Sequence, residues 1–82
     1  MEIKIITLKV IVYLKKHKLW QKWEKAAILF EENIKHPSLH TELLEPKEEM
    51  IYSFRIDKKY RVLFMVKNNK AFVFRVTNHY RK

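Results

Sequence analysis

The chain has 82 residues, of which 48% are hydrophobic and 13% aromatic, and it carries a formal net charge of +9. This length supports one hydrophobic core, so we expect a single domain over residues 1–82, and the apolar content excludes a disordered chain. The absence of cysteine excludes disulfides and thiolate metal sites. The sequence has no apolar run of about 18 residues and no signal-peptide layout, so we expect a cytoplasmic protein without a membrane-spanning helix.

The positive charge is concentrated in the second half of the chain. Residues 1–46 carry a net charge of +2, whereas residues 47–82 carry ten lysines or arginines against three acids, a net charge of +7. Such a basic block favours a polyanion or an acidic protein as partner. The alternative is a solvated basic surface without a specific partner.

The N-terminal part of the chain predicts an edge strand followed by a helical hairpin. Residues 1–6 alternate weakly between apolar and charged side chains, as an edge strand does. Thr7 is a suitable N-cap for a helix over residues 8–17, although the β-branched residues there also leave a strand possible. Residues 19–35 place apolar side chains three and four apart, which puts them on one face of a second helix.

Residues 36–49 are expected to connect this hairpin to the second half of the chain. His36 precedes a proline, and such a residue avoids helical dihedral angles, so the second helix is expected to end there. Ser38 is a candidate cap for a short turn that reaches Leu43 or Leu44. The chain has no glycine, so its tight turns have to use Asn, Asp or Lys.

The segment 50–77 carries the strongest pattern in the sequence. Its apolar and aromatic residues fall on alternate positions, a period of two that is typical of half-buried strands. Polar turns at 57–59 and 68–70 interrupt the pattern. The predicted strands are 50–57, 60–67 and 71–77. We therefore expect a two-layer α+β fold, in which the helical hairpin packs on an antiparallel sheet of three or four strands.

The parity of these positions places a group of cations on one side of the predicted sheet. The apolar and aromatic residues that form this alternating set are even-numbered, although Leu63, Met65 and Val73 stand at odd positions. Successive residues of a strand face opposite sides. Arg55, Arg61, Arg75 and His79 are odd-numbered and share the other face. This requires an odd number of residues in each hairpin loop, or a bulge beside a two-residue Asn-Asn turn. The apolar face of the sheet then has to be covered by the helices, and the opposite face is cationic.

The order of these features resembles the RelE/ParE superfamily of bacterial type II toxins. The segments that carry the resemblance are His36-Pro37-Ser38-Leu39, Tyr52-Ser53-Phe54-Arg55-Ile56, Tyr60-Arg61-Val62-Leu63-Phe64 and Asn78-His79-Tyr80. The resemblance covers nearly the whole chain and implies the two-layer fold of that superfamily. The His-Tyr ending is most similar to the YoeB branch, whose members are toxins that cleave messenger RNA in the ribosome.

The resemblance also implies the site residues and the partners. The implied catalytic residues are Glu42, Arg61, His79 and Tyr80. The basic residues expected to bind RNA phosphates are Arg55, Arg75, Lys47 and Arg81. The implied partners are an acidic cognate antitoxin, the ribosome with its messenger RNA, and a second copy of the chain as a candidate dimer partner. No cofactor and no metal are expected.

These residue types match the needs of RNA cleavage without a metal. The neighbouring 2′-hydroxyl attacks the phosphate, so the site needs a base for the hydroxyl proton, an acid for the leaving 5′-oxygen and cations for the phosphoryl oxygens. Glu42 is the candidate base, His79 the candidate acid and Arg61 the candidate phosphate clamp. Arg55 would assist the clamp, and Tyr80 would orient or stack on a base.

Two other functions stay open from the sequence. A ParE-like chain of this fold would inhibit DNA gyrase by binding and would need no general acid, so the His-Tyr ending favours the nuclease. An inactive basic binding module is the third candidate, because the acids at 48–49 would repel RNA. A zinc site at His36 and His40 is not expected, since Pro37 keeps the two imidazoles from sharing a helical face.

Overall fold

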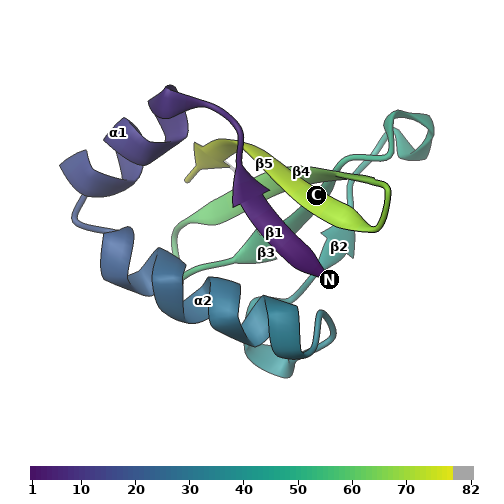
Figure 1. Ribbon diagram of the computed structural model, residues 1–82, viewed down its shortest axis with the longest axis horizontal. Helices are drawn as coiled ribbons and strands as arrows, with labels where there is room; N and C mark the ends of the chain where they lie inside the picture. The colour runs from purple at the N-terminus through teal and green to yellow at the C-terminus, as the bar shows by residue number, and fades with distance from the viewer. Residues whose placement is uncertain (79–82) are drawn as a thin grey trace.

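Two helices lie against one face of a five-stranded sheet in the computed structural model, which describes residues 1–78 (Figure 1). The strands are β1 (Glu2–Ile5), β2 (Glu42–Leu43), β3 (Tyr52–Arg55), β4 (Arg61–Lys67) and β5 (Lys70–Thr77), in the sheet order β1-β5-β4-β3-β2. The α-helices are α1 (Leu8–Lys16) and α2 (Trp20–Glu32), and the short 3-10 helices are η1 (Pro37–Leu39) and η2 (Lys47–Glu49). The expected two-layer α+β fold is confirmed.

Helix α1 begins and ends with the local signals that a short helix needs. The Thr7 side chain accepts a hydrogen bond from the backbone N–H of Lys9, which confirms the predicted N-cap. At the other end Lys18 adopts a left-handed φ of 58°, and the N–H of Leu19 donates to the carbonyl of Leu14 at 2.7 Å. This left-handed closure is usually formed by glycine, and here a lysine forms it because the chain has none.

Helix α2 ends at Glu32, earlier than the proline signal predicts. Asn33 leaves the helical region with φ −160° and ψ 101°, and its side-chain oxygen accepts from the N–H of Lys35. Asparagine competes with the helix in this way because its side chain satisfies nearby backbone donors. The expected Ser38 cap is also wrong, since the Nδ1 atom of His36 caps η1 by accepting from the backbone N–H of Ser38.

The sheet is mixed and has one strand more than the upper number expected. Strand β1 is an edge strand, as the alternation predicts, but it runs parallel to β5, with Ile3 opposite Ala71. The additional strand, β2, lies in the segment expected to be a connection, and it pairs antiparallel with β3 through Glu42 and Ser53. Two residues are too short for a periodic signal, so the sequence did not reveal β2.

The β3–β4 hairpin and the β4–β5 hairpin both keep the odd-numbered arginines on one face of the sheet, but they do so with different loops. The loop between β3 and β4 has five residues, 56–60, and Arg55 pairs with Arg61. The turn between β4 and β5 has two residues, Asn68 and Asn69, both with positive φ. A β-bulge opposite Leu63/Phe64 adds one residue to β5, so Arg75 lies on the same face as Arg55 and Arg61.

Because of this bulge, the predicted set of core-facing residues is wrong in the first half of β5. In the first half of β5 the odd-numbered Ala71 and Val73 are buried, so the expectation that Phe72 and Phe74 face the core is wrong. Beyond the shift Val62 pairs with Val76, and the even residues are buried as predicted. Without the bulge the last residues of β5 would face the opposite side of the sheet.

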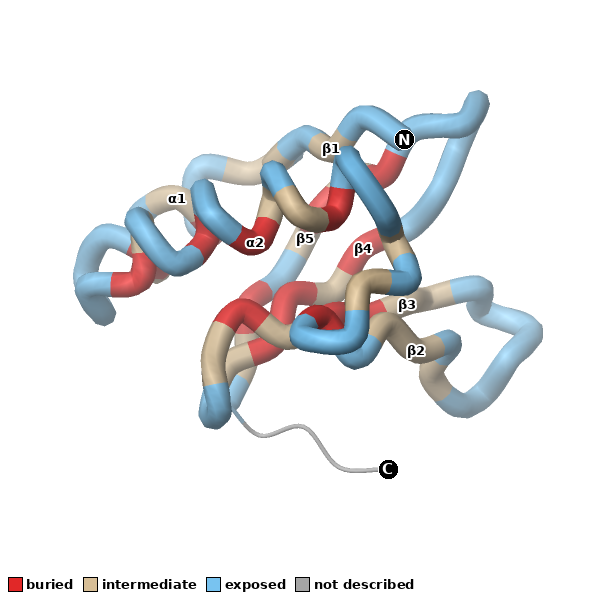
Figure 2. Tube along the Cα trace, turned by 90° about the horizontal axis from the view of Figure 1, so that it is seen from below, coloured by how far each residue is buried: buried red, intermediate tan, exposed pale blue. Residues whose placement is uncertain are grey.

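The core lies between the helices and the inner face of the sheet (Figure 2). Phe54 of β3 is fully buried and stands at its centre. Its ring is 5.0 Å from that of Phe30, 5.8 Å from that of Phe64 and 6.3 Å from that of Trp23. Packing of these aromatic rings ties α2 to β3 and β4, and both α-helices of residues 1–78 lie on this side of the sheet (Figure 1). Among residues 1–78, neither helix has the length and hydropathy that crossing a bilayer would require.

Candidate active site

The strand registers bring the predicted site residues together in two rows on the outer face of the sheet. Directly paired residues of neighbouring strands lie on the same face. The first row is Glu42, Ser53, Leu63 and Arg75, and the second is Arg55, Arg61 and Thr77. Glu42, Arg55 and Arg61, which are 19 residues apart at most in sequence, thus come from three adjacent strands.

Arg61 is the most buried charged residue of this face, with 6% of its surface exposed. Its Nε–H donates to the Oγ of Ser53 at 3.0 Å. Its Nη2 donates to the backbone carbonyl of His40 and, at 3.4 Å, to that of Ser53, and it lies 3.7 Å from the Oε2 of Glu42. A buried guanidinium needs such partners, because an unpaired charge in this position would be strongly destabilising.

The segment that carries Glu42 is held in place from two sides. The Thr41 hydroxyl donates to the carbonyl of Ile34 at 2.7 Å, and the His40 carbonyl accepts from Arg61. His40 itself has a left-handed φ of 47°, which turns the chain from η1 into β2. The carboxylate of Glu42 is 28% exposed, so it reaches solvent while it faces the buried cation.

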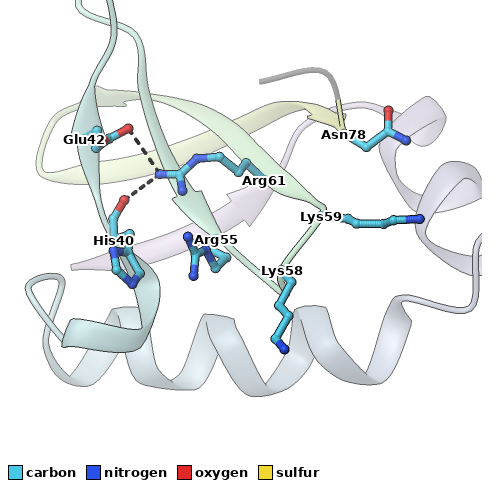
Figure 3. A pocket seen from close by; sticks show the side chains of 7 residues that line it. All are labelled: His40, Glu42, Arg55, Lys58, Lys59, Arg61 and Asn78. Carbon is cyan, nitrogen blue, oxygen red and sulfur yellow. Dashed lines mark hydrogen bonds and ion pairs between the residues drawn. The ribbon is translucent and has the colours of Figure 1, made fainter. Parts of the chain in front are cut away.

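An open pocket of about 540 Å³ lies over this part of the sheet. It is lined by His40, Glu42, Arg55, Lys58, Lys59, Arg61 and Asn78. Figure 3 shows these side chains, with the guanidinium of Arg61 between the Glu42 carboxylate and the His40 carbonyl. Four of the seven residues are lysine or arginine, so the pocket attracts anions and has the chemistry of a phosphate site.

Hydrogen bonds to the Asp57 carboxylate fix the loop between β3 and β4, which supplies Lys58 and Lys59 to the pocket. Asp57 Oδ1 accepts from the N–H of Lys59 and of Tyr60, both at 2.8 Å, and Oδ2 accepts from Lys22 of α2 at 3.1 Å. Burial raises the pKa of this carboxyl, but the two amides and the lysine outweigh burial and hold the pKa below its usual range. Lys58 and Lys59 are the exposed residues of a loop that is otherwise anchored.

The structure gathers some of the predicted residues and separates others. Arg55 lines the pocket with Glu42 and Arg61, as the parity argument requires. Arg75 shares the outer face, but it is exposed and stands two strands from Ser53, roughly 10 Å away. Lys47 lies in η2 and does not line the pocket. His79, Tyr80 and Arg81 lie outside the described residues.

Sequence reasoning gave no site role to four polar residues that line the pocket, which are His40, Lys58, Lys59 and Asn78. Lys58 and Lys59 stand between two strands whose facing ends are Arg55 and Arg61, and this position was a usable signal for a shared cationic end. His40 was considered only as a zinc ligand, whereas its ring lines the pocket near Arg55 (Figure 3). Within residues 1–78, no three His, Cys, Asp or Glu side chains gather into a group that fits a metal ion.

Solved structures with the same fold include bacterial toxins. The YoeB/ParE toxin from Agrobacterium tumefaciens matches with a TM-score of 0.71 over 98% of this chain and 100% of that chain, at 16% identity. The Staphylococcus aureus YoeB dimer matches with a TM-score of 0.71 over 98% of both chains, at 19% identity. The heterotetrameric YoeB-YefM toxin-antitoxin complex of the same organism contains a chain that matches with a TM-score of 0.69, at 19% identity.

The sequence comparisons extend over a shorter part of the chain. An uncharacterized protein from Haemophilus influenzae is 53% identical over 35 residues, which are 43% of this chain and 35% of that protein. The chain therefore spans about a third of the length of that relative. No protein-family model matches the chain. The likeness to solved structures thus establishes the fold.

Proposed function

Since the chain has the fold of the YoeB and ParE toxins, we propose that it is the toxin of a toxin-antitoxin pair and that it cleaves messenger RNA on the ribosome without a metal. The observation that supports this best is the pocket on the outer face of the sheet, where a carboxylate and four lysine or arginine side chains meet. A base beside several phosphate-binding cations is what cleavage by the 2′-hydroxyl requires.

The proposed reaction uses Glu42 as the base. Its carboxylate takes the proton of the 2′-hydroxyl, the 2′-oxygen bonds to phosphorus, and the bond from phosphorus to the 5′-oxygen breaks. His79 would donate a proton to that 5′-oxygen, and Tyr80 would orient the neighbouring base. The products are a 2′,3′-cyclic phosphate and a 5′-hydroxyl. The contact at 3.7 Å between Glu42 and Arg61 supports the first step, because the buried guanidinium holds the carboxylate in place at the pocket.

The cations have different proposed roles because their burial differs. Arg61 uses Nε and Nη2 within the protein, so it orients Glu42 and supplies positive charge beneath the phosphate. Arg55, Lys58 and Lys59 also line the pocket, and no ion pair among residues 1–78 involves them. Arg55 is the residue proposed to contact the phosphoryl oxygens, whereas Lys58 and Lys59, whose side chains point away from Glu42 in Figure 3, add positive charge around the pocket.

Primer extension on messenger RNA in a translating extract tests this function. We expect new 5′ ends with the wild-type protein when ribosomes are present and none when they are absent. Glu42→Gln should lower the cleavage rate by about 10²- to 10⁴-fold, the usual contribution of a positioned base. Glu45→Gln, a change of an exposed carboxylate nearby in sequence, should leave the rate unchanged and serves as the matched control.

Two outcomes would contradict the proposal. Equal rates for Glu42→Gln and Glu45→Gln would remove Glu42 from the mechanism. No cleavage by the wild-type protein, together with inhibition of DNA supercoiling by gyrase, would support the ParE-like alternative instead.

The proposal includes two protein partners. The net charge of +9 complements an acidic antitoxin, and the S. aureus neighbour was solved as a YoeB-YefM complex. Another S. aureus neighbour is a YoeB dimer, so a second copy of the chain is a candidate partner as well. Sedimentation velocity of the purified protein measures whether the dimer forms, with a single monomer-sized species as the contradicting result.

A further inference from the structure

A second hollow, of about 370 Å³, lies beside the candidate active site, between α2 and the loop that connects β3 to β4. The two hollows share Arg55 and Lys58 in their linings, so they adjoin at the end of β3. In Figure 3 the side chain of Lys58 points toward α2, which places it between the two. We refer to the hollow beside α2 as the α2 subsite.

The α2 subsite has an apolar floor and a cationic rim. Its apolar residues are Ala26, Leu29, Leu39 and Ile56, and its cations besides Arg55 are Lys22, Lys25 and Lys58. Its volume is within the range of small-ligand pockets, about 300–1,000 Å³. Proteins that bind single-stranded nucleic acids combine a basic groove for the backbone with side chains on which the bases stack, usually aromatic ones. In this hollow the side chains beside the basic rim are aliphatic.

The rim lysines differ in their ion pairs, and the loop that carries Lys58 is anchored to α2. Within residues 1–78 no ion pair involves Lys25 or Lys58, whereas Lys22 is paired with Asp57 at 3.1 Å. The same Asp57 fixes the loop through the N–H groups of Lys59 and Tyr60. The backbone of the loop that carries Lys58 is therefore anchored to α2 before any RNA binds, which lowers the entropic cost of ordering this loop.

We propose that the α2 subsite binds the nucleotide next to the scissile linkage in RNA, with its base on the apolar floor and its phosphate between Lys25 and Lys58. This inference rests on the proposed function, because it takes the adjoining pocket to be the cleavage position. It assigns α2 a part in RNA binding, and it gives the RNA a direction across the protein, from the outer face of the sheet around the end of β3 toward α2.

Binding of a fluorescein-labelled 2′-O-methyl RNA hexanucleotide, followed by anisotropy, tests the subsite without cleavage. The methyl group blocks the nucleophile, so binding is measured alone. We expect Lys25→Ala to weaken binding three- to tenfold, on the order of one lost phosphate contact, and to reduce the slope of log K against log salt by about 0.7. Lys9→Ala removes an exposed helical lysine on α1, which lines neither hollow, and should bind like the wild type.

The base contact is tested by scanning the same hexanucleotide with single abasic residues. One abasic position is expected to weaken wild-type binding several-fold through loss of the base on the apolar floor. Equal losses at all positions, or none, would overturn this part of the inference. Stronger binding of an oligoglutamate peptide than of the RNA, with the same dependence on Lys25, would overturn it in favour of an acidic protein partner.

Cleavage assays separate failure of the subsite from failure of the proposed function. On ribosome-bound messenger RNA, Lys25→Ala should raise KM and leave kcat unchanged. If the wild type cleaves and Lys25→Ala matches Lys9→Ala in both assays, the subsite is wrong and the nuclease stands. If the hexanucleotide binds through Lys25 and the wild type never cleaves, the subsite stands and the nuclease proposal is wrong.

Discussion

Replacing Arg61 by lysine should destabilise the protein although the charge is kept. Arginine presents five N–H donors in a rigid fork, whereas lysine presents three donors on one nitrogen. The fork lets Arg61 serve the Ser53 hydroxyl through Nε and the His40 carbonyl through Nη2 at the same time. One ammonium group cannot occupy both positions, so at least one charge-assisted hydrogen bond is lost in a site that is 6% exposed.

The size of the effect follows from the number of bonds lost. A hydrogen bond to a charged group contributes about 1.5–3 kcal/mol, and lysine recovers part of one such bond. We therefore expect Arg61→Lys to lower the free energy of unfolding by about 2–3 kcal/mol. At roughly 4–8 °C per kcal/mol for a protein of this size, Tm should fall by about 10–20 °C.

Urea and thermal unfolding followed by circular dichroism measure this change. Arg75→Lys is the matched control, because Arg75 is a strand arginine on the same face that is exposed, and it should stay within about 0.5 kcal/mol of the wild type. A free energy of unfolding for Arg61→Lys that equals that of Arg75→Lys would refute the reasoning, since it would mean that the bidentate contacts contribute nothing.

Three further predictions concern the loop, a helix end and the core. Asp57→Asn should lower the free energy of unfolding by about 0.5–1 kcal/mol at neutral pH. Because the pKa of Asp57 is depressed in the folded protein, this loss should be constant above about pH 5 and should shrink as the pH falls below the ordinary aspartate pKa of about 3.9. Urea melts at a series of pH values measure it. A pH-independent difference would contradict this. Lys18→Gly should stabilise by about 0.5–1 kcal/mol, since glycine adopts the left-handed φ of 58° without a steric cost, and an unchanged Tm would speak against it. Phe54→Ala should cost about 3–5 kcal/mol by leaving a cavity among three rings, whereas Val66→Ala, at a side chain that is 40% exposed, should cost under about 1 kcal/mol in the same melts.

The two layers and the main strands could be predicted from the periodicity of apolar residues, because this periodicity shows which side chains face the core. The alternation from Tyr52 onward predicts the bounds of β4 and β5 to within one residue, whereas the predicted strand 50–57 is longer than β3 at both ends. The apolar spacing of α2 predicts the face that carries Trp23 and Phe30. Features set by a few local hydrogen bonds could not be predicted in this way. The end of α2 at Asn33 and the two-residue strand at Glu42 are of this kind.

The candidate site could also be predicted only in part. Parity was sufficient to place Arg55 and Arg61 on one face, because a strand offers a side chain only two directions. Parity does not say how deep a residue lies, so it did not show that Arg61 is buried and bonded within the protein. It also says nothing about loops, and Lys58 and Asp57 were therefore taken only as turn residues.

The chemical identity of the RNA ends tests the account most directly. Mass spectrometry of fragments from ribosome-bound messenger RNA should show a 2′,3′-cyclic phosphate on one fragment and a 5′-hydroxyl on the other. A single 2′-deoxy nucleotide at the cut site should abolish the cut. Fragments that end in a 3′-hydroxyl and a 5′-phosphate, or cleavage that persists at the 2′-deoxy position, would contradict the 2′-hydroxyl mechanism and the role of Glu42 as its base.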